Sequence, residues 1–241
     1  MNDMGEAIRG IPRSHIMIVS LLPLVLNIFL TPYMIISLLS LDEFLRDPVY
    51  YIYNYGPVLW SAYHVLLTML VWYFVKREGG AFKEIIGSVR GASTSSMVIV
   101  ISLTAFSMIW FQVVEPAVTN LFLGAGYMEQ IITSFKEISF SIFLYSVIIT
   151  SLTAGVCEEI IWRGYLQTRL QRMLGGRLYR AIAIQALLFG LWHGLSIHAI
   201  FTAVFGYLYG FIYAKTKRLT PIIVSHWLGD ILGFNIMYYI M

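Results

Sequence analysis

The sequence predicts an all-α fold, a polytopic transmembrane helical bundle of about seven spans, and three observations support this class. Of its 241 residues, 59% are hydrophobic and only 12% are charged, and the mean hydropathy is +0.76. These values are typical of polytopic membrane proteins rather than of soluble domains. Apolar segments close to the roughly 20 residues that cross a bilayer recur along the chain, and basic residues gather in alternate loops.

The predicted spans cover residues 16–41, 50–75, 92–114, 138–157, 181–198, 199–214 and 219–240. The first is too long for the apolar core of a signal peptide, so we expect it to be retained. Between the third and fourth spans, Pro116, Gly124 and Gly126 break the apolar pattern and predict a short interfacial helix. Leucines at every fourth position after the fourth span predict that its helix continues into the cytoplasm as far as Gly175.

The loops predict the orientation of the chain. The first loop is rich in acidic residues, whereas the second is basic, which places the second loop in the cytoplasm. The basic residues of the second loop are Lys76, Arg77, Lys83 and Arg90. The N-terminus, with Arg9 and Arg13, is then also cytoplasmic, as are the arginines of residues 169–180 and the basic run 215–218. We expect an integral, multi-pass protein of a prokaryotic plasma membrane, because no eukaryotic retention signal is present.

Ionisable residues interrupt three of the apolar segments, and such residues are costly within a membrane unless they serve a function. They are Glu158, Glu159 and Arg163, then His193, then His226 and Asp230. With a rise of about 1.5 Å per helical residue from the nearest arginines, Glu158, His193 and His226 reach one layer in the cytoplasmic half. A buried acid/base site is the simplest use for such a set. No basic stripe indicates a nucleic-acid partner, and the single cysteine, Cys157, excludes an intrachain disulfide.

Helical spacing suggests individual roles. Glu159 and Arg163 stand four residues apart, the spacing of a helical ion pair, which leaves Glu158 as the better candidate for a general base. Phe189 shares a face with His193, and Asp230 with His226. A carboxylate one turn from a histidine can orient its ring or bind a metal with it. We expect His64 to be a packing residue and His198 to lie outside the layer, at the outer end of its span.

In this order, Glu-Glu-x-x-x-Arg, Phe-x-x-x-His and His-x-x-x-Asp resemble the motifs of the CAAX-protease and bacteriocin-processing family of intramembrane proteases. The resemblance assigns residues 138–241 to a catalytic transmembrane core and leaves the transmembrane helices of residues 1–137 without a role. It implies hydrolysis of a peptide bond near the cytoplasmic leaflet, with Glu158 and His193 activating water and His226 and Asp230 stabilising the oxyanion. Glu159, Arg163 and Phe189 are expected to be structural or to position substrate.

The family also suggests partners, namely the lipid bilayer and a peptide or protein substrate. Some relatives remove the last three residues of a prenylated Cys-a-a-X tail, so a prenylated C-terminus is one expectation. This chain has Asp230 where the prenyl proteases commonly have Asn, and an ionised aspartate cannot donate a hydrogen bond. Asp230 is therefore protonated, or orients His226, or binds a metal.

The sequence favours a site without a cofactor, because the His-Glu-x-x-His spacing of common zinc proteases is absent. Zinc is the alternative, with Glu158, His193 and His226 as its ligands. Three other functions are alternatives to this intramembrane protease. A rhomboid-like serine protease would use Ser196 with His226, which the spans place at opposite faces. A proton-coupled transporter would show inverted repeats, and a non-catalytic scaffold or immunity protein would keep its function without Glu158.

Overall fold

The computed structural model describes residues 12–87 and 93–241, and every regular element within them is a helix. Arg9, Arg90 and the start of the third predicted span lie outside the described residues. The elements, in which η marks π-helical segments, are α2 (Arg13–Leu24), η2 (Val25–Leu30), α3 (Thr31–Leu38), α4 (Leu41–Arg46), α5 (Pro48–Arg77), α6 (Phe82–Ile86), α7 (Thr94–Ile109), η3 (Trp110–Val114), α8 (Glu115–Leu123), α9 (Ala125–Lys136), α10 (Phe140–Tyr145), η4 (Ser146–Thr150), α11 (Ser151–Thr153), η5 (Ala154–Gln167), α12 (Thr168–Met173), α13 (Leu178–Trp192), α14 (Ile197–Thr216) and α15 (Leu219–Tyr239).

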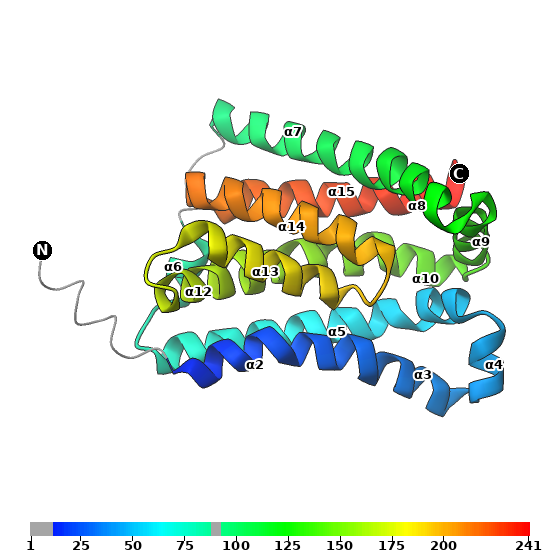
Figure 1. Ribbon diagram of the computed structural model, residues 1–241, viewed down its shortest axis with the longest axis horizontal. Coiled ribbons are helices and arrows are strands. Elements are labelled where there is room, and N and C mark those ends of the chain that lie inside the picture. Colours follow the sequence, from blue (N-terminus) through cyan, green and yellow to red (C-terminus); the bar gives the residue numbers. More distant parts are fainter. Residues whose placement is uncertain (1–11, 88–92) are drawn as a thin grey trace, which may run out of the picture.

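The elements join into long helices that run side by side between two ends of the molecule (Figure 1). Five helical stretches within the described residues are long and apolar enough to cross a membrane: Arg13–Leu38, Pro48–Arg77, Thr94–Leu123, Phe140–Met173 and Ile197–Thr216. The shorter α13 and the 21-residue α15 lie between the same two ends. The all-α membrane bundle is thus confirmed, whereas the count of seven crossings stays a prediction.

The third long helix differs from its prediction, because it continues past residue 114 to Leu123. Pro116 falls in the first turn of α8, directly after the π-helical η3. A proline inside a continuous helix removes one backbone hydrogen bond, and the irregular π-helical turn before Pro116 is where such a break is accommodated. Gly124, with φ of 95°, ends this helix, and α9 follows as the short helix that the sequence predicted, at the same end of the bundle as the C-terminus (Figure 1).

The fourth long helix lies at the centre of the bundle and carries the acidic motif. It runs without interruption into α12 and stops before Gly175 and Gly176, whose φ values are 67° and 85°, so the predicted helical extension is confirmed. Gly155 lets this helix approach α15 closely, since a Cβ at residue 155 would lie 2.9 Å from the backbone nitrogen of Trp227. This approach brings the segment with Glu158 beside the segment with His226.

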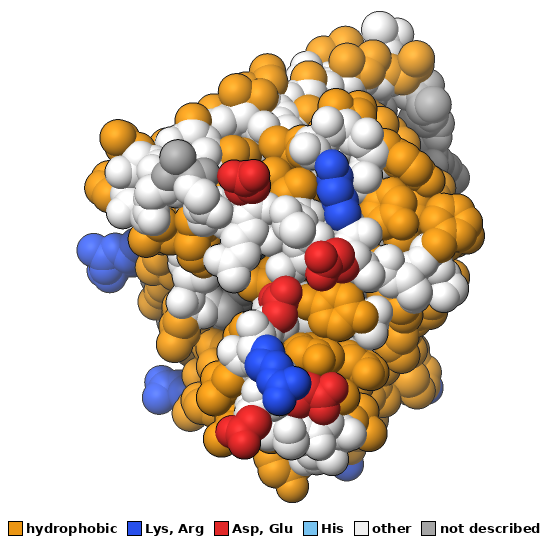
Figure 2. All heavy atoms as spheres, turned by 90° about the vertical axis from the view of Figure 1, so that its right-hand side faces the viewer, with side chains coloured by type: hydrophobic (Ala, Val, Ile, Leu, Met, Phe, Trp, Pro, Cys, Tyr) orange, Lys and Arg blue, Asp and Glu red, His pale blue; other side chains and the backbone are white. Residues whose placement is uncertain are grey.

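The two ends of the bundle differ in charge. We call one the basic end, and its basic residues are Arg13, Lys76, Arg77, Lys83, Arg169, Arg172, Arg177, Arg180, Lys215, Lys217 and Arg218. The opposite end, the acidic end, is formed by α4, the start of α5 and α9 (Figure 1). These elements and the residues beside them carry Asp42, Glu43, Asp47, Glu129 and Glu137 with Arg46 and Lys136, and Figure 2 shows acidic side chains gathered on this face.

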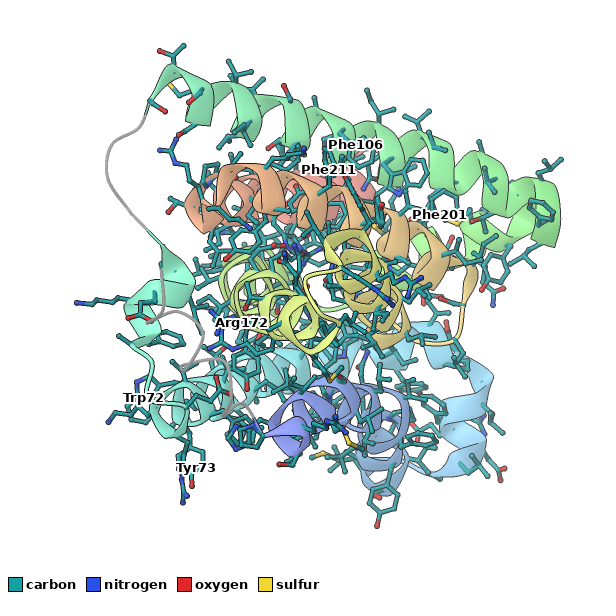
Figure 3. The ribbon with its side chains drawn as sticks, turned by 60° about the vertical axis from the view of Figure 1, so that its left-hand side comes forward. Trp72, Tyr73, Phe106, Arg172, Phe201 and Phe211 are labelled. Atoms are coloured by element: carbon teal, nitrogen blue, oxygen red, sulfur yellow. The ribbon has the colours of Figure 1, made fainter. Side chains whose placement is uncertain are left out.

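Aromatic side chains near the basic end match a membrane interface. Trp72 and Tyr73 point away from the bundle (Figure 3), and each is 44% exposed. The Nζ of Lys76 lies 4.4 Å from the Trp72 ring centre, and the Cζ of Arg77 lies 5.3 Å from that of Tyr73. Aromatic rings beside basic residues are typical of the boundary between lipid and water.

Candidate active site

A cavity of about 530 Å³ lies inside the bundle, and the predicted catalytic residues line it together. Glu158 contributes from η5, His193 from the end of α13, and His226 and Asp230 from α15. Three further ionisable residues that were not predicted for the site also line the cavity: His64, Glu115 and His198. The segments that the sequence expected to meet therefore share one chamber.

Glu158 is buried, with 3% of its surface exposed, and its two carboxylate oxygens have different surroundings. Its Oε1 accepts a hydrogen bond from Nε2 of His64 at 2.8 Å. Its Oε2 has no hydrogen-bond partner among the described residues and lies 3.9 Å from Nε2 of His226. One oxygen is therefore held, while the other is left for a reacting molecule.

The packing role predicted for His64 is therefore incomplete. The ring is buried at 2% exposure and stacks on Trp192, but it also bonds Glu158, and its Nδ1 lies 3.2 Å from Oγ1 of Thr153. The signal was present in the sequence, because His64 is an ionisable residue on an apolar span. Like His193 and His226, it is costly within a membrane unless it serves a function.

His226 is held by the second acid of the motif. Its Nδ1 donates to Oε1 of Glu159 at 2.8 Å, and the same oxygen accepts from Nη1 of Arg163 at 3.0 Å. The Nε2 of His226 therefore faces the gap between Glu158 and Asp230, whose Oδ2 lies 3.8 Å away. Orienting the ring, one of the roles expected for Asp230, thus falls to Glu159, because Glu159 bonds the imidazole whereas Asp230 lies beyond hydrogen-bond distance.

Arg163 is fully buried and does not belong to the cavity wall. Its guanidinium carbon lies 4.3 Å from the ring centre of Phe189 and 5.7 Å from that of Tyr209. Of the two roles expected for Glu159 and Arg163, this geometry favours the structural one. Phe189 supports Arg163 with one face and also lines the cavity, with its ring centre 4.9 Å from that of His193.

His193 follows the last residue of α13, and its Nδ1 donates to the carbonyl oxygen of Phe189 at 2.9 Å. No hydrogen bond within the described residues occupies its Nε2. The ring centre of His198 lies 5.7 Å away, and Nδ1 of His198 lies 2.8 Å from Oε1 of Glu115. A second histidine–carboxylate pair therefore stands beside His193.

The prediction that His198 lies outside the layer is wrong, because the predicted span 181–198 is not a single helix. Helix α13 ends at Trp192, and Gly194, with φ of 104°, turns the chain at once. Few residues other than glycine adopt this conformation readily. Helix α14 begins at Ile197, so its first turn places His198 next to His193.

The same turn brings Ser196 to the cavity, whereas the sequence placed this residue at the face opposite His226. No hydrogen bond among the described residues joins Ser196 to a histidine, so the geometry shows no serine–histidine pair. In the described part of the chain, no group of three or more His, Cys, Asp and Glu side chains has the arrangement of a metal site.

Comparison with known protein families matched one part of the chain. Residues 139–232 match the family model described as "Rce1-like: Type II CAAX prenyl endopeptidase Rce1-like". The match supports an Rce1-like CAAX protease domain over this part of the chain. The matched region contains all the motif residues, but His64 and Glu115 lie outside it, on helices that precede it in the chain. No curated protein and no solved structure matched the chain. The Rce1-like match and the apolar helices together support an integral membrane protein that contains a peptidase-like domain.

Proposed function

We propose that this Rce1-like protein is an intramembrane endopeptidase that hydrolyses a peptide bond with a water molecule activated by Glu158 and His193. The observation that carries the proposal is the free oxygen of Glu158. It is buried, has no hydrogen-bond partner among the described residues, and belongs to a cavity wall that also includes His193, His226 and Asp230. A carboxylate next to imidazoles in a confined site is suited to general acid–base chemistry.

In the proposed reaction, Oε2 of Glu158 takes a proton from water while Oε1 stays bonded to His64. His193, anchored through Nδ1, holds the same water through Nε2. The hydroxide oxygen attacks the peptide carbonyl, and Nε2 of His226 stabilises the oxyanion that forms. The C–N bond then breaks, and the proton on Glu158 passes to the leaving amine. Hydrolysis therefore consumes one water and regenerates the site.

Two supports keep His226 ready for its role. Glu159 accepts from Nδ1 of His226 and from Arg163, so the ring is fixed and its Nε2 faces the cavity. Asp230 lies 3.8 Å from Nε2, and its side chain is 29% exposed. In this arrangement Asp230 needs no hydrogen to donate, because its charge stabilises a positive imidazole while negative charge develops on the substrate. Asp230, at the position where the prenyl proteases commonly have asparagine, thus fits an oxyanion site built on His226.

The proposal also includes the orientation of the chain in the membrane and a mechanism without a metal ion. The charge difference between the two ends favours a cytoplasmic basic end and a cytoplasmic N-terminus, in a prokaryotic plasma membrane. The placement of the reaction near the cytoplasmic leaflet stays a prediction. So does the metal-free mechanism, for which zinc held by Glu158, His193 and His226 is the alternative.

The test is cleavage of a panel of reporter peptides, with and without a farnesyl group, by the purified protein in liposomes, before and after chelator treatment. We expect cleavage that survives the chelator and is lost in Glu158→Gln. Loss of activity on chelation, restored by added zinc, would replace the metal-free mechanism with the metal-dependent one. If the biological activity of the chain survived in Glu158→Gln, the non-catalytic scaffold would be the correct function.

A further inference from the structure

We infer that substrate reaches the site from the acidic end of the bundle, so that the cleaved segment is a cationic stretch of polypeptide that enters from the non-cytoplasmic side of the membrane. The inference rests on the proposed function for its chemistry. The entry route and the kind of substrate rest on three separate observations: the course of the cavity, the packing on the opposite side of the site, and the distribution of charge.

The cavity extends from the site toward the acidic end. Beyond Glu158 and His226, its wall is formed by the first turns of α5, by α8 and α9, and by the last turns of α15. Met128 and Ile131 of the amphipathic α9 belong to this wall. Tyr127 and Met241, which are 39% and 38% exposed, lie at its outer rim. Figure 1 places α9 and the C-terminus at this same end of the molecule.

The opposite route, toward the basic end, is closed by packed side chains. Directly beyond Glu158 on the same helix, Trp162, Arg163 and Tyr165 are at most 1% exposed, and none of them belongs to the cavity wall. Nearer the surface, Glu78 ties three elements together: it accepts from the hydroxyl of Tyr165 at 2.6 Å and from Nη2 of Arg169 at 2.9 Å. Substrate entering here would have to break up the core.

Charge identifies the side of the membrane and the kind of substrate. The positive-inside rule assigns the basic end to the cytoplasm, so the open route faces the other side. The acidic end carries five acidic residues against Arg46 and Lys136 (Figure 2), and Glu115 and Asp230 line the route inside. A negative entrance attracts cationic chains and disfavours a free C-terminal carboxylate. The structure therefore favours an internal bond flanked by lysine or arginine.

Cysteine labelling tests the route, because Cys157, the chain's only cysteine, is buried. Ile131→Cys places a thiol in the cavity wall, and two control variants place one elsewhere. Gln130→Cys is exposed on the same helix, and Arg172→Cys is exposed at the basic end. Right-side-out membrane vesicles are treated with a bulky, membrane-impermeant maleimide, and each variant's cleavage rate is compared with its own rate before treatment.

We expect the reagent to label the two α9 cysteines but not Arg172→Cys, and to lower cleavage at least tenfold in Ile131→Cys alone. Labelling of Arg172→Cys instead of the α9 variants would overturn the orientation. Labelling of Ile131→Cys without an effect on cleavage would overturn the route. If no vesicle cleaved peptide even before treatment, the proposed function would fail, whereas the labelling pattern would still report the side that the cavity faces.

The substrate charge is tested separately with two peptides that differ only in having lysine or glutamate beside the scissile bond. We expect the lysine peptide to have the higher kcat/KM by about tenfold at low ionic strength, with the preference falling as salt is added. Equal kcat/KM values for the two peptides, or a preference for glutamate, would overturn the cationic substrate class.

Discussion

Replacing His64 by phenylalanine removes the hydrogen bond to Glu158 and keeps an aromatic ring against Trp192. The lost contact is a buried bond of 2.8 Å to a carboxylate. Hydrogen bonds to charged groups contribute about 1.5–3 kcal/mol, and each 1.4 kcal/mol corresponds to about tenfold in rate. If the bond holds Glu158 in its reactive position, His64→Phe should lower kcat by about 10- to 150-fold.

The assay is peptide cleavage in liposomes, with kcat and KM measured separately for the parent, His64→Phe and His64→Gln. We expect KM to stay nearly constant, because His64 contacts the base rather than the proposed entry route. His64→Gln keeps an N–H donor and should recover a large part of kcat, which a purely packing role would not explain. A folded His64→Phe protein with kcat within twofold of the parent would refute the positioning role.

Three further predictions concern the supports of the site. Arg163→Leu leaves Glu159 buried without its ion-pair partner and should lower the free energy of unfolding by about 3–5 kcal/mol, measured by thermal unfolding in detergent. Gly155→Ala places a Cβ 2.9 Å from the backbone of Trp227 and should lower stability by about 1–3 kcal/mol, whereas Gly126→Ala, with no atom within 4 Å, should be neutral. Burial raises the pKa of Glu78, but hydrogen bonds from Tyr165 and Arg169 outweigh this and leave the pKa below its usual value. Glu78 therefore stabilises the fold at neutral pH and loses this effect as the pH falls through its lowered pKa, so Glu78→Gln should lower stability by about 1–2 kcal/mol at pH 7 and flatten the acid limb of the stability curve.

The sequence was sufficient to find the motif residues of the site. Charged side chains are rare on apolar segments, so Glu158, Glu159 and Arg163 stand out without any knowledge of the fold. Spacing also predicted the Glu159–Arg163 pair, because both residues lie on one helix and local geometry decides their contact. The helical class and the extension of the fourth helix followed from composition and periodicity in the same way.

Contacts between distant segments could not be predicted in this way. His64 meets Glu158 across 94 positions of the chain, and nothing in the local pattern of either segment specifies that meeting. The position of His198 depended on a turn at Gly194, which the apolar run from residue 181 concealed. The direction of the cavity depends on which core side chains fill the space around the site. The number of residues between an ionisable side chain and the membrane surface, counted along one helix, does not specify that packing.

The most direct test of the account is the cleavage rate of Glu158→Gln beside that of Glu84→Gln, an exposed acid at the basic end, with both proteins folded and in the same liposomes. General base catalysis typically contributes about 10²–10⁴-fold. We predict a loss of at least about 100-fold for Glu158→Gln and none for Glu84→Gln. Equal cleavage by the parent and Glu158→Gln would contradict the assignment of Glu158 as the base.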